Sequence, residues 1–134
     1  MLRLGGRMMI PKFRAWNMPF GPKGPMQEMV YGKASSILAF AEMSPDKYIV
    51  EQSTGLKDVN SREIYEGDIV KMHIVALSPD DKIGYVEYHK QYGYSLIMNK
   101  RRYRQEYWAT DNHAEYEVIG NVHKNPELLE AQHD

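Results

Sequence analysis

The fold is decided by residues 66–75, which read EGDIVKMHIV. The Glu-Gly-Asp triplet predicts a tight turn, because glycine adopts the positive φ that such turns need and aspartate accepts bonds from nearby backbone N–H groups. Apolar Val70, Met72 and Ile74 then alternate with polar residues. Since successive side chains of a strand point to opposite faces, the stretch predicts a turn followed by a strand with one buried face.

Similar short apolar and aromatic stretches lie on both sides of this strand. Turn-forming residues separate them at intervals of about 8–12 residues, a spacing typical of small barrels and sandwiches. We expect further strands at residues 12–16, 27–31, 48–50, 83–89, 94–98, 106–110 and 116–123. The sequence therefore predicts an all-β fold, a small barrel or pseudo-barrel with SH3-like elements, and a short C-terminal helix at 126–130.

Three segments have sequence patterns that differ from that of residues 66–75. Residues 34–43 are compatible with either a buried strand or one short helix, because their apolar residues show no clear period. Residues 53–61 are rich in Gly, Asp, Asn and Ser and predict a polar loop. Residues 12–16 alternate basic and apolar side chains, which predicts a strand buried on one face only.

Length and composition limit what the chain can be. It has 134 residues, 17 Lys and Arg against 18 Asp and Glu, 43% hydrophobic residues and no cysteine. One domain is expected at this length, and we place it at residues 9–130, between a flexible leader at 1–8 and a tail at 131–134. The absence of cysteine excludes a disulfide framework, a thiolate zinc site and an iron–sulfur cluster.

The sequence carries no targeting signal that we recognise. Its start lacks the apolar region of a secretory signal, and no apolar run reaches the about 20 residues that span a bilayer. We therefore expect a cytoplasmic protein without a membrane partner.

A combined signature is spread over three parts of the chain. It consists of residues 9–16 (MIPKFRAW), 52–58 (QSTGLKD) with 64–70 (IYEGDIV), and 117–122 (EVIGNV) with 125–129 (NPELL). In this order and spacing the segments resemble the YopX family, small proteins of phages and prophages with no established biochemical role. The resemblance implies a mostly β fold and an origin in a mobile element, and it brings no catalytic residue to this chain.

Motifs for catalysis and cofactors are missing from the sequence. It contains no P-loop, no dinucleotide-binding glycine pattern and no nucleophile elbow, and its five histidines form no H-x-x-x-H pair. Acidic and amide residues between positions 58 and 68 offer oxygens to a hard cation, but turn capping by Asp58, Asn60 and Asp68 explains the same pattern, and we favour it. We predict no enzyme activity, no cofactor and no metal.

One basic cluster with neighbouring aromatic residues is the strongest candidate for a binding site. Its members are Lys100, Arg101, Arg102, Tyr103, Arg104 and Trp108. Cations neutralise phosphates and aromatic rings stack on exposed bases, so one interpretation is a nucleic-acid site. We favour a second one, a charged hairpin tip that keeps a sheet edge soluble, because the net charge is close to zero and Glu106 is adjacent. Pairing of Arg102 and Arg104 with carboxylates of a partner subunit is a third interpretation.

These observations favour a protein that acts by binding. Our first hypothesis is a non-enzymatic phage or prophage accessory protein, an interaction module that binds a phage or host protein or assembles with itself into a homo-oligomer. The alternative is a nucleic-acid-binding small β-barrel that uses the basic cluster at 100–104. Salt-dependent retention on DNA separates the two hypotheses, because phosphate contacts weaken as salt rises.

Overall fold

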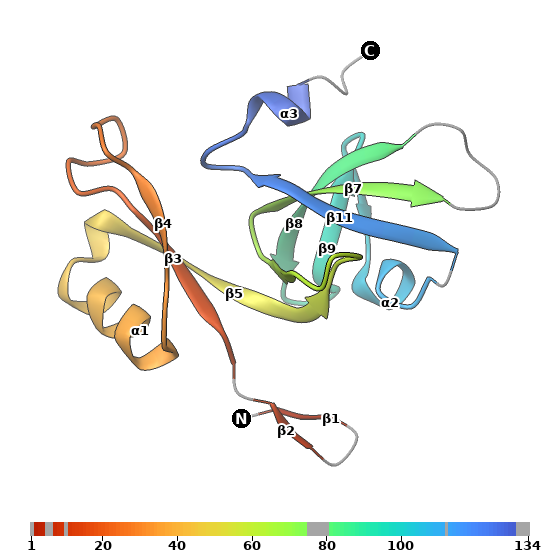
Figure 1. The fold of residues 1–134 in the computed structure, drawn as a ribbon, viewed down its shortest axis with the longest axis horizontal. Coiled ribbons are helices and arrows are strands. Elements are labelled where there is room, and N and C mark those ends of the chain that lie inside the picture. Colours follow the sequence, from red (N-terminus) through yellow and green to blue (C-terminus); the bar gives the residue numbers. More distant parts are fainter. Residues whose placement is uncertain (1, 5–6, 10, 75–80, 112, 131–134) are drawn as a thin grey trace. The chain divides into compact units, whose positions relative to one another are not determined.

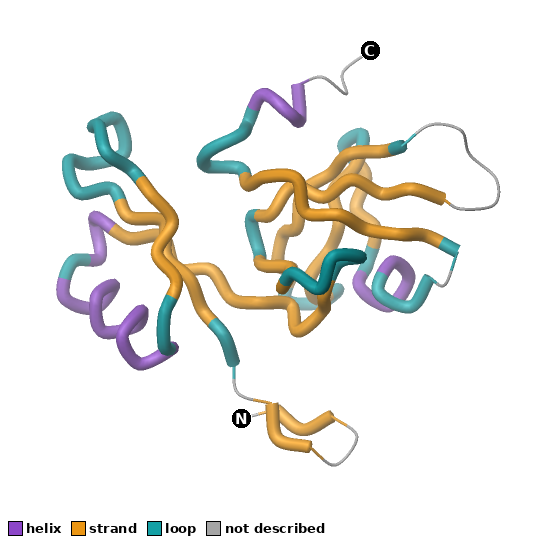
Figure 2. Tube along the Cα trace, in the orientation of Figure 1, coloured by secondary structure: helices purple, strands orange, loops and turns teal. Residues whose placement is uncertain are grey.

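Antiparallel strands dominate the computed structural model of this protein (Figure 1), which describes residues 2–4, 7–9, 11–74, 81–111 and 113–130. Strands cover much more of the chain than helices do (Figure 2), so the all-β prediction is confirmed. By its contacts the chain divides into two compact units, which we call unit 1 (Met1–Gly55) and unit 2 (Leu56–Asp134). The single domain at 9–130 and the flexible leader at 1–8 stay predictions, and the tail at 131–134 lies outside the described residues.

Unit 1 is a small sheet with one helix packed on it. Its elements are β1 (Leu2–Leu4), β2 (Arg7–Met9), β3 (Phe13–Asn17), β4 (Glu28–Tyr31), α1 (Ala34–Met43), the 3-10 helix η1 (Pro45–Lys47) and β5 (Tyr48–Lys57). β1 pairs with β2, and β3 pairs antiparallel with both β4 and β5. α1 contacts β3, so the two interpretations of residues 34–43 are settled in favour of a helix.

Strand β3 is buried on both faces, and the prediction of a half-buried strand is wrong. Arg14 stands directly across from Glu51 of β5, and its Nε donates a hydrogen bond to Glu51 Oε1 at 2.9 Å. Both side chains are buried, and an unpaired buried charge would be strongly destabilising. The partner lies 37 residues further along the chain, so the local alternation of basic and apolar residues could not reveal it.

Unit 2 is built on a curved five-stranded antiparallel sheet, which forms a half-barrel in Figure 1. Its elements are β6 (Glu63–Tyr65), β7 (Asp68–Ile74), β8 (Lys82–His89), β9 (Gly93–Met98), β10 (Arg101–Tyr103), α2 (Gln105–Trp108), β11 (Ala114–Asn121) and α3 (Glu127–Glu130). The five-stranded sheet has the order β10, β9, β8, β7, β11, and β6 is not part of it. α3 is the short C-terminal helix that the sequence predicted.

The core of unit 2 lies on the face that the alternation in residues 66–75 predicted. Val70 and Met72 are buried there, and side chains from β8, β9 and β11 pack with them. The other core residues are Ile64, Val86, Leu96, Met98, Trp108 and Val118. The half-barrel agrees with the predicted pseudo-barrel, whereas the SH3-like likeness stays a prediction.

The prediction of a strand at 106–110 is wrong, because the chain forms the short helix α2 there. The carbonyl of Arg104 accepts hydrogen bonds from the N–H groups of Tyr107 and Trp108 at 3.0 and 3.2 Å, which closes a helical turn. Trp108 thereby points into the core. Its burial, which the sequence cannot show, favours the helical turn over an extended strand.

The loop after β5 is organised by one buried carboxylate. Asp58 Oδ1 accepts hydrogen bonds from the N–H groups of Asn60 and Arg62 at 2.9 and 2.8 Å, and Oδ2 accepts one from Val118 of β11 at 2.9 Å. In the next turn Asp68 Oδ2 accepts a bond from Tyr65 N–H at 2.8 Å. Turn capping by both aspartates is confirmed, and the loop expected at 53–61 is shorter because β5 continues to Lys57.

These bonds set the ionisation of Asp58. Burial by itself raises the pKa of the Asp58 carboxyl, but the three backbone hydrogen bonds and the nearby charge of Arg62 outweigh it, so the pKa lies below the usual 3.8. A carboxyl whose pKa is lower in the folded than in the unfolded state stabilises the fold above the unfolded pKa. That stabilisation is lost as the pH falls through the lowered folded pKa.

The substitution Asp58→Asn tests this role. We expect it to lower the free energy of unfolding at pH 7 by about 1–3 kcal/mol, because charge-assisted bonds to three N–H groups are weakened. Chemical denaturation of both proteins at pH 7 and at pH 3 measures the difference. It should shrink at pH 3, because that pH lies below the ordinary pKa of 3.8 and the carboxyl of the unfolded wild type is then mostly protonated. An equal difference at both pH values would contradict the account.

Candidate functional site

The basic cluster lies on the hairpin of β9 and β10, which we call the basic hairpin. Met98 pairs with Arg101, so the connection has only two residues, Asn99 and Lys100. Both have positive φ, 51° and 64°, as in a type I′ hairpin turn. Lys100 thus holds a left-handed conformation that favours glycine, and the hairpin stores backbone strain at its basic tip.

The four cations of the cluster have different surroundings. Lys100 and Arg101 are exposed, and their side chains form no ion pair or hydrogen bond within the part of the chain that the structure describes. Arg102 pairs with Glu87 of β8 across the sheet. Arg104 follows β10 and pairs with Glu106 of α2 at 3.1 Å. Two of the four charges are therefore neutralised inside the chain, and two remain available to a ligand.

Arg104 is held between two tyrosine rings, and we call Tyr92, Arg104 and Tyr107 the Arg104 clamp. Its guanidinium carbon lies 5.1 Å from the centroid of the Tyr92 ring and 4.9 Å from that of Tyr107. The guanidinium also donates a hydrogen bond to Tyr107 Oη at 2.6 Å, which raises the pKa of Arg104 further above its ordinary value. His89 stacks on Tyr92 with 4.7 Å between ring centroids. The clamp fixes a permanent charge at the surface.

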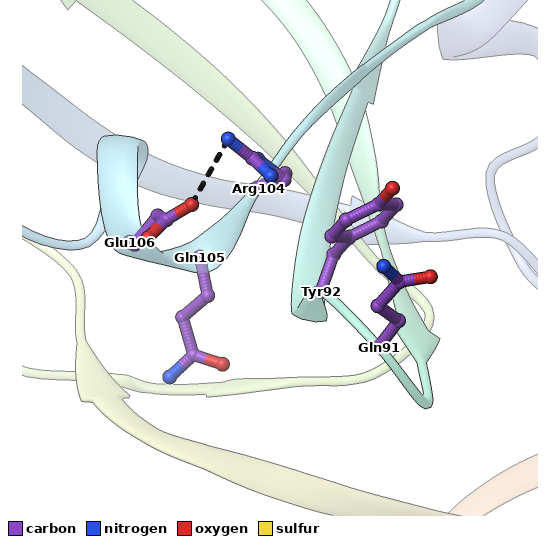
Figure 3. A pocket seen from close by; sticks show the side chains of 5 residues that line it. All are labelled: Gln91, Tyr92, Arg104, Gln105 and Glu106. Atoms are coloured by element: carbon purple, nitrogen blue, oxygen red, sulfur yellow. Dashed lines mark ion pairs between the residues drawn. The ribbon is translucent and has the colours of Figure 1, made fainter.

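An open pocket of about 510 Å³ lies beside the clamp. The side chains of Gln91, Tyr92, Arg104, Gln105 and Glu106 line it, with the ion pair of Arg104 and Glu106 along one side (Figure 3). Its polar groups are two amides, a phenol, a guanidinium and a carboxylate. This set can both donate and accept hydrogen bonds.

Gln105 attaches the pocket to the sheet. Its N–H donates to Tyr92 O at 3.3 Å, and its side-chain Oε1 accepts from Tyr94 N–H at 2.9 Å. Gly93 has φ 73°, and a Cβ on it would come within 2.5 Å of Gln105 Oε1. A glycine at this turn is therefore needed both for the backbone conformation and for the approach of Gln105.

The structure brings only part of the predicted site together. Trp108 is buried in the core, where its Nε1–H donates to Tyr94 O at 2.8 Å and its ring meets Tyr116 edge-on. Tyr103 is half-buried against the same core. Neither ring joins the exposed cations, so Tyr92 and Tyr107 take the place that we expected for Trp108.

Sequence reasoning missed Gln91 and Gln105, because uncharged amides carry no signal of their own. It also did not identify the carboxylate of Glu106 as the partner of Arg104. Among the described residues, no three His, Asp or Glu side chains are grouped closely enough to hold a metal ion. In the same residues no helix is both long and apolar enough to cross a bilayer.

The strained turn predicts the effect of a substitution. Lys100→Gly should raise the free energy of unfolding by about 0.5–1 kcal/mol, because relief of the left-handed strain exceeds the entropy cost of glycine. Lys100→Ala is the matched control, since it removes the same charge and keeps the strain. Thermal and chemical denaturation measure both variants, and an equal gain in Lys100→Ala would assign the effect to charge and not to the backbone.

A solved structure and a family model each match most of this chain. A crystal structure of the protein EF1440 from Enterococcus faecalis matches with a TM-score of 0.53 and 27% sequence identity, covering 91% of this chain and 99% of that one. No curated protein matches this sequence. A family model described as YopX protein matches residues 12–130, which agrees with the signature found in the sequence. This chain belongs to the YopX family.

Proposed function

We propose that this protein is a non-enzymatic interaction module whose unit 1 binds a second copy of the chain. The observation that carries the proposal is helix α1, in which seven of the ten residues are apolar although Ile37 is its only buried residue. A helix of this composition is normally covered by other apolar surface. We therefore propose that a partner covers the exposed apolar side chains of α1.

Helix α1 has little local stabilisation of its own. Lys33 at its N-cap makes no side-chain cap bond, no acidic residue lies in its first turn, and no basic residue lies in its last turn. Leu38, Phe40 and Met43 are 44%, 43% and 80% exposed. Short helices depend on packing for their stability, so burial of these side chains by a partner would strengthen α1 itself.

A second apolar surface of unit 1 is preorganised. The loop between β3 and β4 exposes Phe20 by 65% and Met26 by 76%. Gln27 holds this loop, because its amide N–H₂ donates to the carbonyls of Pro22 and Gly24 at 2.9 and 3.0 Å, and its Oε1 accepts from Trp16 Nε1–H at 2.8 Å. A loop fixed in this way loses little entropy on binding.

Exposed apolar side chains are concentrated in unit 1. Among the described residues, seven of the ten large apolar side chains that are exposed belong to it. They are Phe20, Met26, Tyr31, Leu38, Phe40, Met43 and Ile49. Such concentration is typical of protein-binding surfaces. The pocket of unit 2 adds no support for catalysis, since its lining pairs no hydroxyl or imidazole with a base.

Self-association is tested by measuring mass against concentration. We expect light scattering to give a mass above 15.6 kDa that rises with concentration for the wild type. The double variant Leu38→Glu with Met43→Lys should raise the dissociation constant by about 100-fold or more, because burial of two such side chains contributes about 3 kcal/mol.

The control for this experiment is Val59→Glu, which places a charge at another exposed apolar side chain, in the loop of unit 2. It should leave the mass unchanged. A wild type that stays at the mass of one chain at every concentration, or a control that dissociates as much as the double variant, would contradict the proposal.

A second candidate function is nucleic-acid binding by the basic hairpin. It is favoured by Lys100 and Arg101, which are exposed at the tip and have no partner among the described residues. Because Arg102 and Arg104 are neutralised by Glu87 and Glu106, we propose that two cations, not four, contact phosphates.

The number of free cations predicts the salt dependence. Two phosphate contacts give a slope of about −1.4 for the logarithm of the association constant against the logarithm of salt concentration on a single strand. Fluorescence anisotropy with a labelled oligonucleotide measures it. A slope near −3 would mean that all four cations take part, and no binding at about 20 mM salt would rule out this function.

A further inference from the structure

We propose that the pocket beside the Arg104 clamp binds an unpaired guanine base of a single-stranded nucleic acid, a proposal that rests on the second candidate function above. The five lining residues come from the β8–β9 turn and from the start of α2, and both segments directly adjoin the basic hairpin. The volume of about 510 Å³ is in the range of pockets that hold small organic ligands.

The chemistry of one pair of side chains selects the base. Arg104 and Glu106 lie 3.1 Å apart and offer hydrogen-bond donors next to acceptors (Figure 3). Guanine presents the complementary edge, because its O6 and N7 accept from a guanidinium while its N1–H and N2–H₂ donate to a carboxylate. The ion pair is exposed, and such pairs contribute little to stability, so a base displaces it at low cost.

The rest of the pocket supports a base over other ligands. Tyr107 is outside the lining, but it is 58% exposed and lies against Arg104, so it provides a ring for stacking next to the pocket. Gln105 is anchored through Oε1, so its N–H₂ group remains for a ligand. An acidic peptide fits less well, because each carboxylate that approaches Arg104 also meets Glu106.

The free cations lie where the phosphates of the same strand would pass. Lys100 and Arg104 flank the three residues of β10 and are four positions apart, which corresponds to about 13 Å at about 3.3 Å per residue. Single-strand-binding surfaces cover about 4–16 nucleotides, so one short oligonucleotide reaches both places. Lys100 and Arg101 would then supply affinity, and the pocket would supply base preference.

The experiment uses the full chain and fluorescein-labelled ten-nucleotide DNA probes at low salt. One probe is oligothymidine, and three others carry a single central guanine, inosine or adenine. We expect the guanine probe to bind about tenfold tighter than oligothymidine, with inosine intermediate because it lacks the N2 amino group.

Variants separate the pocket from the hairpin tip. Glu106→Gln and Arg104→Lys should reduce the guanine preference to less than about twofold while binding of oligothymidine is retained. Lys100→Gly with Arg101→Ala should weaken all four probes equally and reduce the salt slope. Lys124→Asn, which removes an exposed lysine outside the hairpin, is the matched control, and thermal unfolding checks that each variant is folded.

The outcomes distinguish the inference from the function on which it rests. Absence of binding to every probe would overturn both. Equal binding of all four probes, with a normal salt dependence, would overturn the guanine pocket and leave nucleic-acid binding in place. Displacement of the guanine probe by oligoglutamate as effectively as by unlabelled DNA would identify a general anion site and would also overturn the proposal.

Discussion

The carboxylate of Asp58 is the constraint on which unit 2 depends. It accepts bonds from two N–H groups of its own loop and from one on β11, 60 residues later. Val59 N–H adds a bond to Tyr116 O at 2.9 Å, so the loop and the edge strand are joined by backbone as well. Without the carboxylate, three N–H groups would lose their acceptor, and buried donors without acceptors are costly. One side chain thus fixes both a turn and the last strand of the sheet.

The opposite edge of that sheet is where binding chemistry collects. β10 is only three residues long and carries two arginines, features that discourage pairing with a further strand. Glu87 neutralises Arg102, and the turn at Asn99 and Lys100 is strained, so the tip is both charged and fixed in shape. Unit 1 has the contrary character, since α1 exposes apolar side chains and few charges. The two units therefore suit different kinds of ligand.

Local patterns predicted the parts of the fold that depend on local physics. The alternation after Gly67 placed β7 and its buried face correctly, and the turn residues Asp58 and Asp68 cap as expected. The burial of residues whose partners are distant in the sequence was not predicted. Arg14 is buried because Glu51 lies across from it, and Trp108 is buried because α2 turns it into the core. The pocket was missed for the same reason, as it joins the turn after β8 to α2 through Gln105.

Our main proposal is that a second copy of the chain covers α1. Hydrogen–deuterium exchange of the α1 amides at low and at high protein concentration tests it, with the β7 amides as an internal reference. We predict that α1, whose only buried residue is Ile37, exchanges rapidly at low concentration and becomes protected at high concentration, while β7 stays unchanged. Rapid exchange of α1 at both concentrations would contradict it.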